Sequence, residues 1–422
     1  MSNGNEMASP GSAPAILILF FLTACASGAR NTPPVEPVTP PASSGIAPAA
    51  SNPSTFAAAL PSPTSNPTDA GMSTSTPAEP TPDWSVKSRQ VDELFASYIT
   101  GRSPGAAVIV IQDGKIAHEA GYGLADLAKG TPVTPSQIFH LASVGKQFTA
   151  LAVLILVEKG KLDLDDPVEK YLPELANFGN GVTIRRLLND TSGIPDAYSG
   201  DLYKALMQQA ARPTNADLLA VLSTADGLLF DPGFQFKYSN TGYDVLGALI
   251  ERVSGESYPD FLEENIFGPL GMKNSFSLPS PRQKTDPLLA HSYVKYQGVI
   301  QPYDTYWLDD IVGSGTIYSN VEDMFLYDQA LYTDAIIPQS TLAEAFQPAV
   351  LYDGVKYPYG FGWEIKDENG IRSYWHSGKW LGYRSFYERF PDLKLSIVVL
   401  MNWNYGPTVE DVESSIRKIY LD

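Results

Sequence analysis

Residues 142–160 read ASVGKQFTALAVLILVEKG and place a serine and a lysine directly before a long apolar run. From residue 145 to residue 159, apolar side chains occupy almost every side of a helical projection, which predicts a buried central helix. Ser143 and Lys146 form an S-x-x-K pattern, and one helical turn at this spacing brings the lysine amine beside the serine hydroxyl. The helix N-terminus also offers N–H groups to a developing oxyanion. The stretch therefore predicts the centre of the fold and a nucleophilic serine.

The same tetrad occurs twice more, so the spacing alone is weakly diagnostic. Ser292 precedes Lys295 in a tyrosine-rich extended stretch, and Ser415 precedes Lys418 in an amphipathic helix near the C-terminal end. Neither serine stands at the start of a buried helix. We therefore interpret both copies as chance matches.

A second candidate element is the tripeptide Tyr238-Ser239-Asn240, which precedes another predicted helix. A tyrosine near a lysine can be held partly as phenolate and act as a general base, and an asparagine can hydrogen-bond a substrate amide. The tripeptide recurs at residues 318–320, where a glycine-rich turn precedes it and acidic residues follow it. That copy is typical of a turn that leads into a capped helix, and we assign it to structure.

The third element is His376-Ser377-Gly378, at the end of one predicted strand and before another. It is the only His-x-Gly in the chain.

Predicted strands lie toward both ends of the chain, and predicted helices lie between them. An opening helix ends at Gly101, and a hairpin follows with strands at 106–112 and 115–122 around the turn Asp113-Gly114. The other predicted helices are 215–224, 241–253, 258–267 and 409–420, and the later strands are 361–365, 371–376, 383–389 and 395–401. This order predicts a sheet built from both ends of the chain with a helical region inserted.

The order S-x-x-K, then Y-x-N, then a basic residue-x-Gly is similar to the motif set of the serine β-lactamase and penicillin-binding protein superfamily. The tyrosine in the middle motif resembles the branch that contains class C β-lactamases, DD-peptidases and family VIII esterases. The segments IRRLL at 184–188 and TSGIP at 191–195 fit that branch as well. The resemblance covers roughly residues 88–420. It implies an α/β (α+β) fold of the β-lactamase/transpeptidase type, with an antiparallel sheet flanked by helices.

The resemblance also implies roles for individual residues. Ser143 attacks a carbonyl and becomes acylated, while Lys146 and Tyr238 manage its proton and Tyr238 protonates the leaving group. The backbone N–H groups of Ser143 and Lys379 form the oxyanion hole. Asn240 orients a substrate amide.

The third motif departs from the class C pattern. His376, with Ser377 and Gly378, is expected to bind substrate, but class C β-lactamases have a lysine at the first of these positions. A histidine is mostly neutral at pH 7, which favours the DD-peptidases and esterases of the branch. Lys379 or Arg384 is a candidate for the missing charge, and both could equally be solvated surface residues.

The N-terminal part has a different composition from the rest. Residues 16–25 form an apolar run too short to span a membrane, and its last four residues, ending in Cys25, resemble a bacterial lipobox. We predict a signal peptide with lipobox at 1–25, a disordered Pro/Ser/Thr-rich tether at 26–84 and the hydrolase domain at 85–422. The expected location is extracytoplasmic, with the chain anchored to the membrane through a lipid on Cys25. An ordinary signal peptide or a different translation start remains the alternative.

Composition narrows the function further. A formal net charge of -18 argues against nucleic acid as a partner. No cofactor is expected, and no metal, because no pair of the four histidines has ligand spacing; they are His118, His140, His291 and His376. No G-x-S-x-G motif of a Ser-His-Asp hydrolase is present.

The main hypothesis is a serine hydrolase that forms a Ser143 acyl-enzyme from an amide or ester. The expected substrate is a small molecule or peptide, most plausibly a peptidoglycan-type peptide ending in D-amino acids, with a β-lactam or an ester next. The alternatives are a carboxylesterase of the same fold and a non-catalytic module that binds a cell-wall ligand.

Overall fold

The structure, a computed structural model, describes residues 83–179 and 181–422. The signal peptide predicted at 1–25, the lipid-bearing Cys25 and nearly all of the tether predicted at 26–84 lie outside these residues and stay predictions. Within the described ranges, no helix combines the length and the apolar character needed to cross a membrane.

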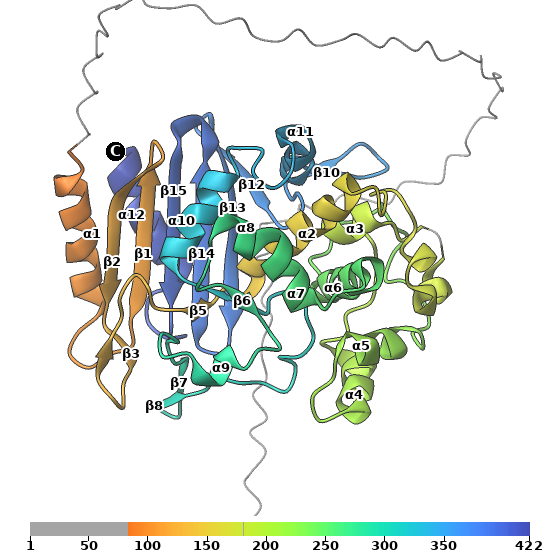
Figure 1. The fold of residues 1–422 in the computed structure, drawn as a ribbon, viewed down its shortest axis with the longest axis horizontal. Coiled ribbons are helices and arrows are strands. Elements are labelled where there is room, and N and C mark those ends of the chain that lie inside the picture. The colour runs from red at the N-terminus through yellow and green to blue at the C-terminus, as the bar shows by residue number, and fades with distance from the viewer. Residues whose placement is uncertain (1–82, 180) are drawn as a thin grey trace, which may run out of the picture. The chain divides into compact units, whose positions relative to one another are not determined.

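A six-stranded antiparallel sheet organises the described residues (Figure 1). One pair of neighbouring strands joins the two ends of the fold, because Ala106 lies opposite Met401 and Gln112 opposite Leu395. In spatial order the strands are β12 (Glu364–Glu368), β13 (Ile371–Trp380), β14 (Tyr383–Phe390), β15 (Leu395–Met401), β1 (Ala106–Gln112) and β2 (Lys115–Tyr122). The predicted sheet from both chain ends is therefore confirmed.

The hairpin of β1 and β2 has the predicted bounds because its turn accepts a left-handed backbone. Asp113 and Gly114 have φ values of 53° and 70°, as a two-residue turn of this hand requires. The turn lets the strands pair from Ala106 with Tyr122 to Gln112 with Lys115.

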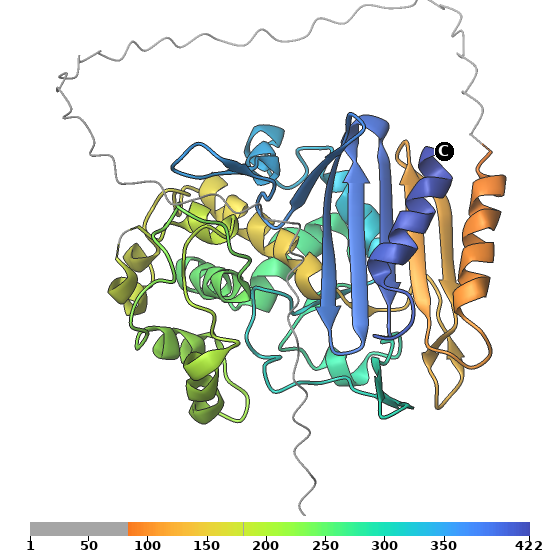
Figure 2. The same ribbon diagram turned by 180° about the vertical axis from the view of Figure 1, so that it is seen from behind.

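Two helices cover one face of the sheet, as Figure 2 shows for α12 (Val409–Leu421). The other is α1 (Ser85–Tyr98), which ends three residues before Gly101, the predicted end of the opening helix. Phe95 and Ile416 are fully buried against valines of the central strands. Burial of this face ties the start and the end of the domain together.

The inserted helices pack on the opposite face around α2 (Lys146–Glu158), whose residues are buried from Lys146 to Leu156. Phe148 stacks on Tyr327, with ring centroids 4.2 Å apart. The predicted central buried helix is confirmed. The other helices are α3 (Ile184–Leu188), α4 (Gly200–Gln209), α5 (Asn215–Leu222), α6 (Asn240–Ser254), α7 (Tyr258–Leu262), α8 (Gly268–Leu270), α9 (Arg282–Thr285), α10 (Val321–Ala330) and α11 (Gln339–Leu342).

Short strands connect these helices. They are β3 (Leu124–Asp126), β4 (Thr131–Pro132), β5 (Phe139–His140), β6 (Phe276–Ser277), β7 (Tyr293–Tyr296), β8 (Val299–Pro302), β9 (Ile317–Ser319), β10 (Ala349–Val350) and β11 (Lys356–Tyr357).

The strand predicted at 361–365 is displaced, and the structure gives the reason. Gly362 has φ +75°, and a Cβ there would lie 2.9 Å from the carbonyl carbon of Lys146. The Phe361 N–H donates to the Ala345 carbonyl oxygen, 2.9 Å away. This segment therefore packs against the start of α2, and β12 begins only at Glu364.

Two further predictions needed correction. The His-Ser-Gly motif lies inside β13, because Gly378 pairs with Ser385 of β14 and the ladder continues to Trp380. The segment predicted as one helix at 258–267 is helical throughout but changes type, since α7 passes into a π-helical turn at Glu263–Phe267. Pro269 in the following turn has no N–H for an uninterrupted helix.

An acidic pair lies buried on the face of the sheet that α12 covers. Glu413 of α12 is 3% exposed, and burial together with the neighbouring Glu388 raises the pKa of its carboxyl to about 10. Arg417 is close, with Nε 3.6 Å from Glu413 Oε1, but it offsets only part of this effect. At neutral pH, the folded protein therefore keeps a proton on Glu413 that the unfolded chain releases.

This proton makes the free energy of unfolding depend on pH. The carboxyl has its ordinary pKa of 4.5 when unfolded and about 10 when folded, so its contribution is complete below the lower value and is lost as pH rises toward the higher one. We expect Glu413→Gln to match wild type in thermal unfolding at about pH 5 and to exceed it at about pH 9. Glu410→Gln, on the same helix, is the control. An equal change with pH in wild type and Glu413→Gln would contradict this assignment.

Candidate active site

Ser143 lies in a tight 3₁₀ turn, Ala142–Gly145, that leads into α2. Two neighbours fix the turn: the Ala142 N–H donates to His140 Nδ1 at 2.9 Å, and the Ser385 hydroxyl donates to the Leu141 carbonyl. Between Leu141 and Ala150, Ser143 alone is not buried. The hydroxyl therefore has the combination of rigid support and access that a nucleophile needs.

Lys146 is fully buried, and its amine has three hydrogen-bond acceptors. Nζ lies 3.4 Å from Ser143 Oγ, 2.7 Å from Asn240 Oδ1 and 2.9 Å from the carbonyl oxygen of Ser314. Burial lowers the pKa of the amine to about 8, against the opposing effect of two buried aspartates. A neutral amine beside the serine is therefore accessible near physiological pH.

The two acceptors other than the serine are themselves fixed. Ser239 caps α6 by accepting from the Gly242 N–H at 3.0 Å, which sets Asn240 at the first helical position. Asp244 accepts from the Ser314 N–H at 3.0 Å and from the Tyr198 hydroxyl at 2.6 Å. In this state, Asn240 binds the lysine, and its predicted contact with a substrate amide stays a prediction.

Tyr238 lies over the same amine, with Lys146 Nζ 4.9 Å from its ring centroid. Burial raises the pKa of the phenol above its ordinary value, and a hydrogen bond with Ser143 lowers it only partly. The resting site therefore favours a neutral phenol, which differs from the expected partial phenolate. A neutral phenol is a proton donor, the form that protonation of a leaving group requires.

His376 is buried and neutral. Burial is the main cause that lowers its pKa to about 3, and the nearby Lys146 charge adds to this. Its Nδ1 lies 2.7 Å from the Ser377 carbonyl oxygen, which can only accept, so Nδ1 carries the hydrogen. Nε2 then accepts from the Tyr359 hydroxyl at 3.3 Å.

The rest of the third motif forms a strand edge beside the serine. The ladder from β12 stops at Trp375, whereas the ladder to β14 runs to Trp380. From His376 to Trp380, β13 thus has no strand partner on its second edge among the described residues. Gly378 approaches the nucleophile turn so closely that a Cβ would lie 2.2 Å from the Leu141 carbonyl oxygen.

Neither candidate for the missing positive charge has its bonding partners at the serine. Lys379 Nζ forms an ion pair with Glu410 Oε1 of α12 at 3.1 Å. Arg384 donates to the carbonyl oxygens of Leu381 and Tyr383, and burial lowers the pKa of its guanidinium to about 10. Their partners lie on α12, in the turn after β13 and at the first residue of β14, so we assign both side chains to structure. The backbone N–H of Lys379 stays the predicted second oxyanion donor.

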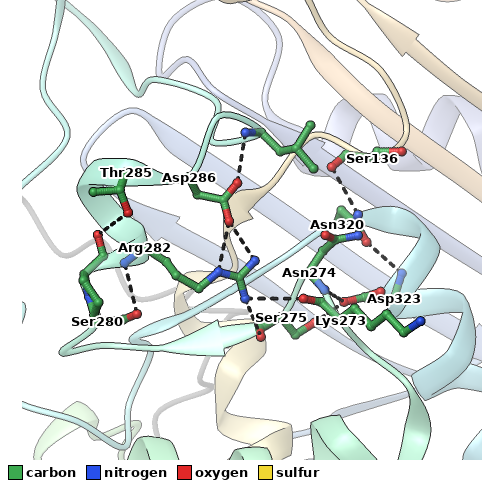
Figure 3. Close-up of polar contacts among 12 residues, drawn as sticks. Ser136, Lys273, Asn274, Ser275, Ser280, Arg282, Thr285, Asp286, Asn320 and Asp323 are labelled. Carbon is green, nitrogen blue, oxygen red and sulfur yellow. Dashed lines mark hydrogen bonds and ion pairs between the residues drawn. The ribbon is translucent and has the colours of Figure 1, made fainter.

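Two of the repeated motifs make structural hydrogen bonds, as predicted for the copy at residues 318–320. Ser292 is fully buried and accepts from the Gly382 N–H at 2.8 Å. Asn320 caps α10 by accepting from the Asp323 N–H at 2.8 Å and donates to the Ser136 carbonyl oxygen at 3.2 Å. Figure 3 shows this cap together with the Arg282–Asp286 ion pair beside it.

Several residues of the site were not found from the sequence: Tyr198, Tyr243, Asp190, Asp244, Ser314 and Tyr359. The glycines on both sides of Ser314 were a usable signal, because a Cβ at Gly315 would lie 2.8 Å from Ala142. The aspartates had no local pattern. Among the described residues, no group of three or more His, Cys, Asp or Glu is arranged to hold a metal ion.

The chain is similar in sequence and in structure to several known proteins. The family model described as Beta-lactamase matches residues 91–420. Penicillin-binding protein 4* of Bacillus subtilis (strain 168) is 34% identical over 331 residues, 75% of this chain and 72% of that protein. D-aminopeptidase of Brucella anthropi is 30% identical, over 74% of this chain and 59% of that protein. The octameric penicillin-binding protein homologue from Pyrococcus abyssi has a TM-score of 0.68 at 28% identity, over 79% of this chain and 77% of that chain.

The close approach at Gly378 leads to a testable expectation. Gly378→Ala should push β13 away from the nucleophile turn, lowering the free energy of unfolding by about 1–3 kcal/mol and any Ser143 acylation by roughly 10²-fold. The measurements are denaturant unfolding and intact mass after incubation with a reactive ester. Gly242→Ala is the matched control, because its Cβ would meet nothing nearer than 3.6 Å. Equal behaviour of the two variants would disprove the constraint.

Proposed function

The chain belongs to the beta-lactamase family of serine hydrolases, and from this premise we propose that it hydrolyses an amide or ester through an acyl-enzyme on Ser143. Its fold is of the β-lactamase and transpeptidase type. The observation that carries the proposal is the Ser143 hydroxyl 3.4 Å from a buried amine of lowered pKa.

The proposed reaction balances with the groups present. Ser143 Oγ attacks the carbonyl carbon while its proton passes to neutral Lys146, and the backbone N–H groups of Ser143 and Lys379 hold the resulting oxyanion. The leaving group departs with the proton of the Tyr238 phenol, and Lys146 returns a proton to the tyrosine. Water then attacks the acyl ester by the reverse path, releases the acid and restores Ser143.

The neutral His376 of the third motif affects which substrates the site can bind. His376 has no charge to offer a substrate carboxylate, and the side chains of Lys379 and Arg384 have other partners. This favours substrates whose leaving group is uncharged. The free edge of β13 can add an extended peptide as a further strand.

We therefore place amides and peptides of D-amino acids first, consistent with the similarity to a D-aminopeptidase. A carboxylesterase of the same fold is the second candidate, and the same neutral histidine supports it.

The first experiment measures the intact mass of the full chain after incubation with four probes. These are a penicillin, a p-nitrophenyl ester, a D-Ala-D-Ala peptide and a D-alanine amide. We expect adducts or turnover that Ser143→Ala abolishes, with the amide and the ester faster than the peptide that ends in a carboxylate. Ser292→Ala is the matched control, since this buried serine has the same S-x-x-K context.

The outcomes separate the alternatives. Adducts that survive in Ser143→Ala would overturn the mechanism. No adduct and no turnover with any of the four probes would favour the non-catalytic binding module. A faster reaction with the carboxylate-ended peptide would overturn the substrate assignment but leave the nucleophile in place.

The rate of acylation should depend on pH in a definite direction. Because the proposed base is the neutral amine of Lys146, whose pKa is about 8, the rate should rise as pH rises through that value and then level off. Stopped-flow acylation by a p-nitrophenyl ester measures it, after correction for spontaneous hydrolysis. A rate that falls through the same range would mean that the ammonium is the active form.

A further inference from the structure

The carboxyl group of Asp190 is buried next to the site, and no described side chain donates a hydrogen bond to it. It is 1% exposed, no described side chain completes a hydrogen bond with either carboxyl oxygen, and the backbone N–H of Ser239 is the one donor among the described residues that acts on it. Buried polar groups short of partners are rare in folded proteins, and a carboxyl group is among the costliest of them. Such a group needs an explanation outside local structure.

The backbone at Asp190 is also held in an uncommon conformation. Its φ is +56°, in the left-handed region that few non-glycine residues adopt. The conformation is held in place because the Asp190 carbonyl oxygen accepts from the Lys237 N–H at 2.9 Å. The loop is thereby tied to the residue directly before Tyr238.

The positively charged group that acts on the Asp190 carboxyl is the amine of Lys146. Two residues before Asp190, the Leu188 carbonyl oxygen accepts from the Tyr243 hydroxyl at 2.6 Å, and the Tyr243 ring lies 5.3 Å from Lys146 Nζ. The Asp190 charge supports the Lys146 cation more than the Asp244 charge does, and the Lys146 charge in turn lowers the pKa of Asp190, which burial raises well above its ordinary value. Burial acts against both charged forms.

Asp244 provides a contrast within the same site. Its carboxylate accepts from the Ser314 N–H and the Tyr198 hydroxyl, so it already has a positioning role for the Ser314 carbonyl that binds Lys146. Asp190 holds only the backbone N–H of Ser239. What remains for it is its charge.

We propose that Asp190 is a positioning residue that sets the protonation state of Lys146 through its buried carboxylate. The proposal rests on the proposed function, because it concerns the proton that Lys146 must lose before it can act as a base. The carboxylate keeps the ammonium form until pH rises, and it bonds to no substrate or reacting atom itself.

Other titratable groups also act on this pair, and they come from every element packed against it. They are Tyr238 before α6, Tyr243 and Asp244 on α6, His376 on β13 and Glu364 on β12. The tyrosines and the histidine are neutral in the resting site, so the carboxylates are the groups that balance the lysine.

The test is the pH profile of acylation in Asp190→Asn. Asparagine has nearly the same shape and tolerates a positive φ, so the loop can keep its conformation. Without the negative charge, the Lys146 amine should lose its proton more readily, and the midpoint of the acylation profile should move to lower pH by about one to three units. A purely structural role would change stability or the maximal rate and leave the midpoint in place.

Asp328→Asn is the matched control, since Asp328 is equally buried but binds Tyr387 and Ser396. Its midpoint should equal that of wild type. An unchanged midpoint in Asp190→Asn, or a shift to higher pH, would overturn the proposal.

A second measurement does not depend on turnover. In protein labelled with ¹³C-lysine, the Cε resonance of Lys146, assigned with Lys146→Met, should titrate at lower pH in Asp190→Asn than in wild type. Loss of acylation in Ser143→Ala tests the proposed function, whereas this titration tests Asp190, so the two can fail separately. Identical titration in both proteins would show that Asp190 does not act on the lysine.

Discussion

A primary amine held out of water at the start of a buried helix is the constraint on which this architecture depends. Burying an ammonium group costs several kcal/mol unless acceptors replace its hydration, on the order of what a whole domain has to spare. Lys146 obtains these acceptors from Ser143, Asn240 and Ser314, which lie on three separate segments. The fold must therefore bring these segments together within hydrogen-bond distance before the amine can be tolerated.

The supports of that amine differ in character, and the difference has chemical meaning. Neutral acceptors and tyrosine rings fill its contact positions. The two aspartates act on it through their charge, with no direct hydrogen bond to it. Direct contact with a carboxylate would hold the proton firmly, whereas neutral contacts leave it free to move. His376 is also held by a neutral partner: its Nδ1 hydrogen bonds to a backbone carbonyl, and the ring stays uncharged.

Local patterns predicted the parts of the fold that local physics decides. The β1–β2 hairpin has its predicted bounds because Asp113-Gly114 adopts the required turn, and α2 was recognisable from its apolar surface. The strand predicted at 361–365 begins later than expected, because Gly362 packs against the start of α2 rather than pairing in the sheet. Ser143 and Lys146 were identified by spacing within one turn. Asp190, Asp244 and Ser314 were missed because their roles arise only where segments distant in sequence meet.

The pairing of β1 with β15 also governs when the domain can form. Ala106 and Met401 lie opposite each other on two paired strands of the sheet, so a chain still lacking β15 has no partner for that edge of β1. During synthesis, the N-terminal hairpin and α1 must wait for the last strands to leave the ribosome, and contacts of such sequence separation close slowly. The turn that carries Ser143 rests on β13 and β14, which also emerge late, so a truncated product would lack the support of this turn as well.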